Sequence, residues 1–384
     1  MTCDIFITNT TCTNPLLKAL HSPSRKTKEK GVKCLRKRKR KKMKNFNISF
    51  KIHRTIPVAS TIVVLAVTSM ILGALLPSVT ATTAGSPYDI AVNLKTNMIY
   101  VTNGGSAIGK IPANTVSVIN GATNTVTATI AVGILPKGID VNSKTNTIYV
   151  ANNGSNTVSV IDGATNIVTT TIPVGLAPYG VAVDQKTNAI YVTNAAANSV
   201  SVIDGRKNTV TDTIGVGLAP KGIAVNQKTD RIYVANSASN TISVIDGKRN
   251  TVTTAITVQP LPKHMVINPN TNTIYVTNRI GNTVSVINGA TNTVTATIAV
   301  GSPYFIALNL STNRLYVTDT GSNTVTVIDS GTNTVTAIIT VGQNPTGVAL
   351  IPSTNKIYVG NGPANTVSVI NGITNIVTAT IALS

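Results

Sequence analysis

The sequence predicts an all-β fold: a seven-bladed β-propeller of four-stranded antiparallel blades, preceded by one hydrophobic N-terminal helix that is a signal peptide or a transmembrane segment. Three observations predict it. One phrase recurs seven times between residues 85 and 384, each copy has four short runs with strand periodicity, and no charged residue occurs from Thr55 to Tyr88. The charged fraction of 11% is too low for a coiled coil, and 42% hydrophobic residues are too many for a disordered chain.

The repeated phrase sets the number of blades. Each copy starts at a proline, passes through an apolar run to a Tyr-Val pair and ends in a run of the type TVTATIAVG. Successive prolines, and likewise successive tyrosines, are 49, 42, 42, 42, 41 and 42 residues apart. The prolines are Pro87, Pro136, Pro178, Pro220, Pro262, Pro303 and Pro345, and the tyrosines are Tyr100, Tyr149, Tyr191, Tyr233, Tyr275, Tyr316 and Tyr358. Four strands in such a repeat are typical of a propeller blade, whereas a β-helix has much shorter repeats.

The turns between runs predict hairpins. Runs rich in Val, Ile, Thr and Tyr alternate apolar and polar residues, as strands do. Asx-Gly pairs between the third and fourth runs predict tight turns with positive φ at the pair, as at Asp162-Gly163, Asp204-Gly205 and Asn288-Gly289. The last copy has its own fourth run, so the final blade should be complete. Residues Val79–Ala84 resemble a further fourth run and predict either an extra edge strand or a stalk.

The N-terminal region predicts export and a membrane contact. Residues 1–54 hold 16 Lys/Arg and 2 Asp/Glu, a net charge of +14 (16 − 2), while residues 55–384 hold 16 and 10, a net charge of +6 (16 − 10). The apolar segment can cross a bilayer, and the positive-inside rule places the basic tail in the cytoplasm and the remainder outside. We expect a tail at 1–54, of which 1–42 are not translated if Met43 is the start, a signal peptide or transmembrane anchor at 55–77, a linker at 78–84 and the propeller at 85–384.

The phrases IYVTN, YVAN and NTVSVID resemble the YVTN repeats of archaeal cell-surface and surface-layer proteins over residues 85–384. This resemblance implies a seven-bladed propeller within the wider WD-type and YVTN-type repeat superfamily, located at the cell surface or outside the cell. It does not imply one activity, because relatives include noncatalytic surface proteins, an exported protein proposed to bind DNA, antibiotic lyases and haem or quinone oxidoreductases.

Positions that all copies share are expected to serve the fold. The last residue of the YVTN phrase is predicted to cap the loop after the second strand by side-chain to backbone hydrogen bonds. The seven tyrosines are predicted to fill the gaps between blades. The capping residues are Asn103, Asn152, Asn194, Asn236, Asn278, Asp319 and Asn361.

Positions at which the copies differ are better candidates for function. The residue after each repeat proline enters the innermost strand at the mouth of the central channel and is aromatic or cationic in six copies. These types predict a site for an anionic glycan or an acidic peptide, because tyrosine faces stack on sugars and ammonium groups attract anions; the alternative is that they only fill the axis. The channel-mouth candidates are Tyr88, Lys137, Tyr179, Lys221, Lys263, His264, Tyr304 and Phe305, with Thr346 in the seventh copy.

Other surface features have weaker signals. The first copy is longer by an insertion between Asn103 and Asn114, which predicts a lid, a partner contact or a tolerated surface loop. On the opposite face, basic hairpins predict a solvated rim or a dock for an anionic envelope polymer. The rim residues are Arg206, Lys207, Arg231, Lys248 and Arg249. Sequons at Asn153 and Asn309 predict glycans, or arise by chance in an Asn- and Thr-rich chain.

The residue types exclude several active sites. After residue 54 there is no Cys and no Glu, and His264 is the only His, so one chain cannot form a Cys/His dyad or a multi-His metal cluster there. We expect no metal, no cofactor and no nucleic-acid partner. The expected function is a noncatalytic binding or structural module of the cell envelope that contacts a glycan or an envelope protein. The alternatives are an exported lyase or oxidoreductase using His264 with Asp89, and nucleic-acid binding through the basic rim.

Overall fold

The computed structural model describes residues 85–104 and 113–383. The predicted tail, hydrophobic segment and linker lie outside the described residues, as do the predicted extra strand Val79–Ala84 and residues 105–112 of the first-copy insertion. Within the described part of the chain, no helix is long and apolar enough to cross a membrane.

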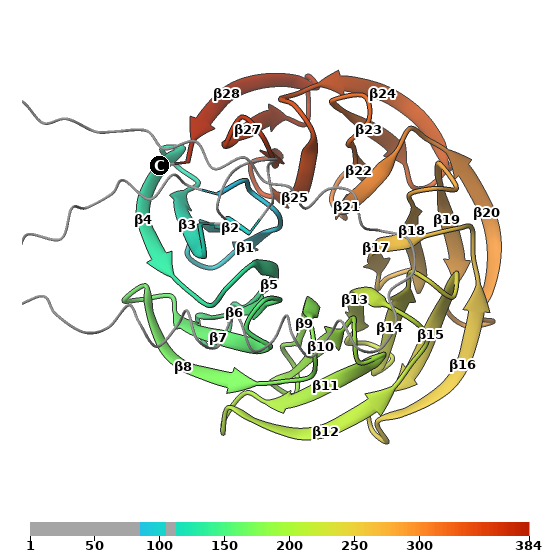
Figure 1. The fold of residues 1–384 in the computed structure, drawn as a ribbon. Coiled ribbons are helices and arrows are strands. Elements are labelled where there is room, and N and C mark those ends of the chain that lie inside the picture. Colours follow the sequence, from blue (N-terminus) through green and yellow to red (C-terminus); the bar gives the residue numbers. More distant parts are fainter. Residues whose placement is uncertain (1–84, 105–112, 384) are drawn as a thin grey trace, which may run out of the picture. The chain divides into compact units, whose positions relative to one another are not determined.

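The described residues form seven four-stranded antiparallel sheets, arranged as blades around a central axis (Figure 1). This confirms the predicted all-β propeller. Strands are paired in chain order within every sheet, so each blade is built from its own repeat, including the last one. The first strand of each blade lies nearest the axis and the fourth lies on the outside (Figure 1).

The first four blades have these strands. Blade 1 contains β1 (Ile90–Asn93), β2 (Met98–Thr102), β3 (Thr115–Asn120) and β4 (Thr125–Ala131). Blade 2 contains β5 (Pro136–Asn142), β6 (Thr147–Asn152), β7 (Thr157–Asp162) and β8 (Ile167–Pro173). Blade 3 contains β9 (Pro178–Asp184), β10 (Ala189–Asn194), β11 (Ser199–Asp204) and β12 (Thr209–Gly215). Blade 4 contains β13 (Pro220–Asn226), β14 (Arg231–Asn236), β15 (Thr241–Asp246) and β16 (Thr251–Thr257).

The last three blades repeat the pattern. Blade 5 contains β17 (Pro262–Asn268), β18 (Thr273–Asn278), β19 (Thr283–Asn288) and β20 (Thr293–Ala299). Blade 6 contains β21 (Pro303–Asn309), β22 (Arg314–Asp319), β23 (Thr324–Asp329) and β24 (Thr334–Thr340). Blade 7 contains β25 (Pro345–Ile351), β26 (Lys356–Asn361), β27 (Thr366–Asn371) and β28 (Ile376–Ala382).

The hairpin turns correct one prediction. Positive φ occurs at the last residue of the turn, as at Asn166 (57°), and not at the Asx-Gly pair. Asn166 closes its turn by donating from its backbone N–H to the carbonyl of Asp162, 2.8 Å away, and asparagine tolerates this left-handed conformation well. Gly163 leaves space for Asn146 instead, because a Cβ there would lie 2.5 Å from the side-chain oxygen of Asn146; in blade 6 the turn accommodates Ser330 at the equivalent position.

The asparagine of the YVTN phrase is structural, but by a different bond from the predicted one. In blade 2, the Asn152 amide nitrogen donates to the hydroxyls of Thr157 and Ser159, at 3.1 and 2.9 Å, on the neighbouring strand β7. The same pair of bonds to strand hydroxyls recurs in blades 1, 3, 4, 5 and 7. The side chain therefore locks the second strand to the third and does not cap the backbone of the loop.

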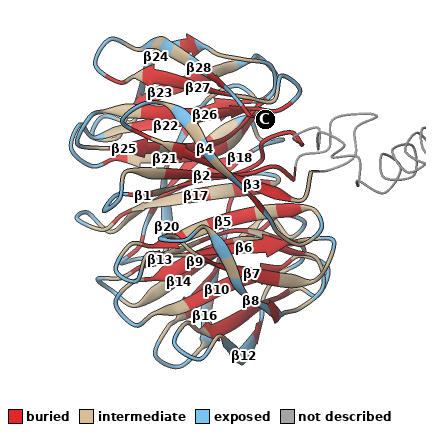
Figure 2. Cartoon of the chain, turned by 90° about the vertical axis from the view of Figure 1, so that its left-hand side faces the viewer, coloured by how far each residue is buried: buried red, intermediate tan, exposed pale blue. Residues whose placement is uncertain are grey.

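The repeated tyrosines lie between blades, as predicted. Tyr100 of blade 1 is fully buried in a cluster with Ile139 and Ile148 of blade 2, and Tyr358 of blade 7 packs with Ile90 and Ile99 of blade 1. Buried residues run along the stacked strands, while exposed residues gather in the loops (Figure 2). The last contact closes the ring by packing between the first and last blades.

Candidate functional site

A β-bulge at the start of the inner strand places the mouth residues in blades 2 to 7. In β5, Pro136 and Ile139 pair with residues of β6 that are only two positions apart, so Lys137 and Gly138 together oppose one residue. The same register shift occurs in blades 3 to 7. Gly138 fits because a Cβ there would lie 2.4 Å from the carbonyl oxygen of Tyr179 in the next blade. Bulges redirect side chains, and here they turn the variable residues toward the axis.

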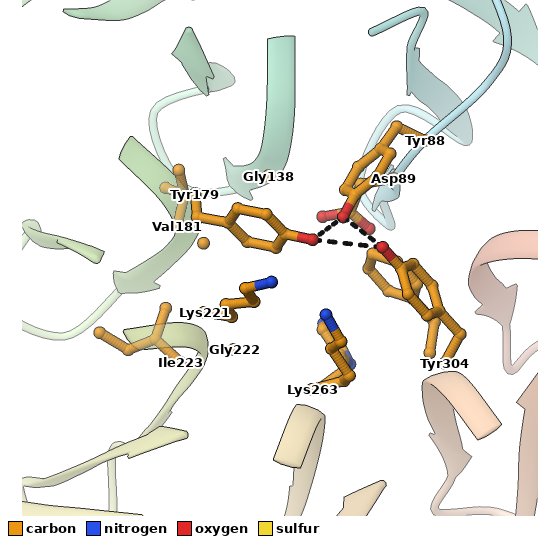
Figure 3. Close-up of a pocket in the computed structure, with 13 residues that line it drawn as sticks. Tyr88, Asp89, Gly138, Tyr179, Val181, Lys221, Gly222, Ile223, Lys263 and Tyr304 are labelled. Atoms are coloured by element: carbon orange, nitrogen blue, oxygen red, sulfur yellow. Dashed lines mark hydrogen bonds between the residues drawn. The ribbon is translucent and has the colours of Figure 1, made fainter. Parts of the chain in front are cut away.

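Three tyrosines from blades 1, 3 and 6 meet at the centre of the mouth (Figure 3). The Tyr88 hydroxyl is 2.7 Å from that of Tyr304 and is hydrogen-bonded to that of Tyr179, and the latter two hydroxyls are 3.2 Å apart. Burial raises the pKa of Tyr179 well above its usual value, so its hydroxyl stays protonated at neutral pH. The triangle of hydroxyls narrows the channel, and because its three mutual bonds use the proton of each hydroxyl, it offers a ligand acceptors and no free donor.

Each of these tyrosine rings has a lysine ammonium group against it. The distances from Nζ to the ring centroid fall within about 6 Å, the range of cation–π contacts. The pairs are Lys137 with Tyr88 at 4.0 Å, Lys221 with Tyr179 at 5.1 Å and Lys263 with Tyr304 at 5.6 Å. Every pair joins two adjacent blades, so the fold brings together three lysine side chains and three aromatic rings that are far apart in the sequence.

The mouth lysines have no carboxylate partner in the described part of the chain, where the three ion pairs all involve other residues. Lys137 donates instead to the carbonyl oxygen of Gly104, 2.8 Å away. Burial and the charge of Lys221 lower the pKa of Lys137 to about 8. Burial, the adjacent Lys221 and the charge of Arg279 lower the pKa of Lys263 to about 6. A bound anion would therefore relieve charge repulsion here.

Arg279 belongs to the mouth although it was not among the predicted site residues. It follows β18 directly, its side chain is exposed, and its guanidinium carbon lies 5.3 Å from the ring centroid of Tyr304. The sequence held a signal for it, because the position after the YVTN phrase varies between copies and only blade 5 has a charged residue there. The equivalent residues are Gly104, Asn153, Ala195, Ser237, Thr320 and Gly362.

The other predicted mouth residues lie in the wall. The rings of His264 and Phe305 are 4.5 Å apart, and burial lowers the pKa of His264 to about 4, so it is neutral at physiological pH. Among the described residues, no hydrogen bond or ion pair joins His264 to Asp89, the pair considered for acid–base chemistry. Thr346 has a structural role, because its hydroxyl donates to the carbonyl oxygen of Pro87, 2.9 Å away, where the ring closes.

The channel is narrow at the tyrosines and wide beyond them. The mouth cavity has a volume of about 20 Å³, room for about one water molecule. Toward the opposite face, a cavity of about 440 Å³ is lined by the inner strands of all seven blades. Asp140 lies in its wall and was also missed as a candidate. The sequence held a signal for Asp140, because the other six copies have only apolar residues at this position. These residues are Ala91, Ala182, Ala224, Val266, Ala307 and Ala349.

Comparison with known proteins identifies the family. Residues 55–263, more than half of the chain, match the choice-of-anchor I domain. The chain belongs to this family. The description of the choice-of-anchor I domain suggests a protein anchored at the cell surface; it does not name YVTN repeats, and that resemblance stays a prediction.

A solved structure is similar to this choice-of-anchor I protein over most of the chain. Kuenenia stuttgartiensis hydrazine synthase is similar with a TM-score of 0.68 and 20% sequence identity, over 75% of this chain and 96% of that chain. At this identity the likeness shows the fold alone. No curated protein matched the sequence at a significant level.

The basic rim of this choice-of-anchor I propeller lies in blades 3 and 4, as expected, and is partly neutralised. Arg249 pairs with Asp246 at 2.9 Å, and Lys248 pairs with Asp230 at 3.7 Å, while Lys186 approaches the same Asp230 at 3.1 Å. Arg206 and Lys207 are exposed on the β11–β12 hairpin, and the Arg231 guanidinium reaches the hydroxyl of Thr253. The rim is a mixed-charge surface, in contrast to the mouth.

The two sequons lie in different environments. Asn309 is fully buried, and its amide nitrogen donates to Asn355, 2.7 Å away, so the folded propeller does not present it to a glycan-transferring enzyme. Asn153 is half-buried and donates to the carbonyl oxygen of Pro178 at 3.1 Å. Glycosylation at Asn153 stays a prediction.

Proposed function

We propose that this protein is a noncatalytic module of the cell envelope, held at the cell surface, whose channel mouth binds an anionic glycan. One observation carries the proposal. The three lysines and Arg279 gather around three tyrosine rings, and no carboxylate lies within ion-pair distance of them in the described residues.

The combination of groups favours a charged sugar. Tyrosine rings offer an apolar face for a pyranose ring and a hydroxyl for its polar edge, and ammonium groups supply donors for carboxylates or sulfates. Arg279 is exposed at the outer edge of the mouth, beside the half-buried Tyr304, so a ligand can reach both from outside without entering the narrow channel. The small mouth cavity favours a ligand that lies across the mouth over one that fills the axis.

Location at the surface is part of the proposal. The hydrophobic segment at 55–77 would serve as a signal peptide or an anchor, and the propeller would lie outside the membrane. Export would put the mouth among envelope polymers, where uronate, sulfate and phosphate groups are available. The basic rim would play no specific role, because aspartates partly neutralise it through the pairs of Lys248 with Asp230 and of Arg249 with Asp246.

The test is a thermal-shift and calorimetric titration of the full-length chain with an oligogalacturonate, a neutral oligosaccharide of equal length and poly-L-glutamate. Oligogalacturonate should raise the melting temperature, because a ligand at 100 times its Kd stabilises the native state by about 2.7 kcal/mol. The double change Lys221→Ala and Lys263→Ala should weaken binding at least tenfold, whereas the rim change Arg206→Ala and Lys207→Ala should not. Equal loss in the rim variant, or no binding of any anion, would refute the proposal, and selective binding of poly-L-glutamate would replace the glycan by an acidic peptide.

A further inference from the structure

The wide part of the central channel differs in chemistry from the mouth. Its 440 Å³ lie within the usual range for small-molecule sites, about 300–1,000 Å³. All seven inner strands point their carboxyl ends toward this side, where the exposed Leu94 and Leu310 and the half-buried Gln185 and Gln227 line the cavity. Among the residues that the structure describes, no lysine or arginine lines it. A small molecule that enters from this face therefore meets walls of Ile, Val, Leu and Ala side chains.

Two carboxyl groups interrupt these apolar walls. Asp89 accepts backbone N–H groups from Ile90 at 2.8 Å and from Ile139 of the next blade at 3.3 Å. Asp140 accepts from Val141 at 2.7 Å and from Val183 of the next blade at 2.8 Å. A carboxylate oxygen can accept two hydrogen bonds, and each of these oxygens accepts one. Both groups thus keep acceptor capacity for a ligand in the cavity.

The fold does not require either carboxyl group. Five of the other six copies have alanine at the position of Asp140 and the sixth has valine, and four of the other six have glycine at the position of Asp89. Those blades make the same inner strand without an acid. Placing charges in a low-dielectric wall is costly unless they are paired. Formation of the blade therefore does not explain why acids occur at two of these positions.

From this cavity, its apolar walls and its two acids, we propose that the wide end of the channel is a second binding site, which takes a primary ammonium group attached to an apolar body. The ammonium group donates to Asp89 and Asp140, and the apolar body lies against the Val, Ile and Ala side chains of the inner strands. Asp89 and His264 line both the mouth cavity and the wide cavity, whereas the mouth lysines line only the mouth or neither, so the two ends of the channel have opposite charge preferences.

The titration of the wall groups supports this assignment. Burial raises the pKa of Asp89 to about 7 and that of Asp140 to about 6. In the described part of the chain, the only other titratable group that lines the cavity is His264, whose lowered pKa keeps it neutral. A bound ammonium ion favours the ionised carboxyls. Its affinity should therefore rise with pH up to about 7, whereas anion binding at the mouth should weaken as pH rises between about 6 and 8.

The experiment is a calorimetric titration of the full-length chain with hexylamine, with 1-hexanol and hexanoate as controls for chain and charge. We expect hexylamine to bind more tightly than 1-hexanol and hexanoate not to bind. Asp140→Ala introduces the residue that most other copies have. It should weaken the binding of hexylamine about tenfold or more and leave the affinity for 1-hexanol unchanged, because only the charged hydrogen bond is lost. Lys221→Ala at the mouth should leave hexylamine binding unchanged.

A second variant keeps the test decisive. Ala224→Leu would narrow the cavity, and Val266 at the equivalent position of blade 5 shows that the strand accepts a larger aliphatic side chain. It should change the affinity for hexylamine and 1-hexanol in the same direction, because both place the same apolar chain against this wall. The proposal is wrong if folded wild-type chain does not bind hexylamine, if hexylamine and 1-hexanol bind equally, or if neither Asp140→Ala nor Ala224→Leu changes hexylamine affinity.

Discussion

Thr326 donates a hydrogen bond to the carboxylate of Asp319 in blade 6, the reverse of the direction found in the six blades that have asparagine. The carboxylate has no proton to give at neutral pH, so the hydroxyl must turn toward it. Asp319 is only 1% exposed, and burial raises its pKa to about 6. One blade thus keeps a buried negative charge where the others have a neutral amide.

Asp319→Asn should stabilise the protein at pH 7. The folded-state pKa lies above the unfolded value of 3.8, so the folded chain holds more protons between about pH 4 and 6, and stability falls as pH rises through that window. Removing the charge should raise the free energy of unfolding by about 1 to 3 kcal/mol at pH 7 and by little at pH 4. Denaturant unfolding at both pH values measures this.

The matched control is Asp329→Asn on the β23–β24 turn, where copies such as Asn288 already have the amide. Hydrogen bonds from backbone N–H groups lower the pKa of Asp329, so this change should not stabilise the protein at pH 7. Equal stabilisation by both substitutions would show that net charge, and not the buried site, is responsible.

Asn236→Ala should be strongly destabilising, because the asparagine is fully buried and donates to Thr241 at 3.1 Å and to Ser243 at 2.9 Å. The loss leaves a buried hydroxyl without its partner and a small void, at a cost of about 2 to 3 kcal/mol. The exposed Gln259→Ala should change the free energy of unfolding by less than about 0.5 kcal/mol. If Asn236→Ala were equally mild, the repeated asparagine would not hold the blade together.

The number of blades and the strands within them could be predicted because periodic apolar residues and regular spacing are local signals. The role of the tyrosines followed from the same repetition. The bond made by Asn152 could not be predicted, since strand register decides that its amide meets Ser159 across the sheet and not a backbone group in the loop.

The candidate site could be predicted only in outline. Variation between copies pointed to Lys221 and Tyr179, but not to the contact between them, which needs the bulge and the neighbouring blade. Arg279 and Asp140 also stand at positions that vary between copies, but they lie on a loop and in a strand whose relation to the axis appears only in three dimensions. The ion pairs of Asp230 with Lys186 and Lys248 at the rim could not be predicted either, because they depend on how blades 3 and 4 pack against each other.

Ala219→Gly should stabilise the protein. Ala219 has a φ of 49° directly before Pro220, a left-handed conformation that costs a residue with a Cβ about 1 to 2 kcal/mol. Glycine relieves this strain but raises the entropy of the unfolded chain, so we expect a net gain of about 0.5 to 1 kcal/mol in the free energy of unfolding. Ala235→Gly in strand β14, at the position of Gly360 in blade 7, should instead lower stability. A loss of stability in both variants would contradict the strain at Ala219.

Anion binding at the mouth should strengthen as pH falls. At pH 8 the lowered pKa of Lys263 leaves its amine mostly neutral, and Lys137, with a pKa of about 8, is half protonated. A bound anion favours the charged forms of both, so binding takes up protons and the affinity for oligogalacturonate should rise between about pH 8 and 6 and then level off. Calorimetry in two buffers of different ionisation enthalpy counts the protons taken up. Lys263→Arg keeps a charge at every pH and should flatten the profile, and an unchanged slope in that variant would assign the protons to another group.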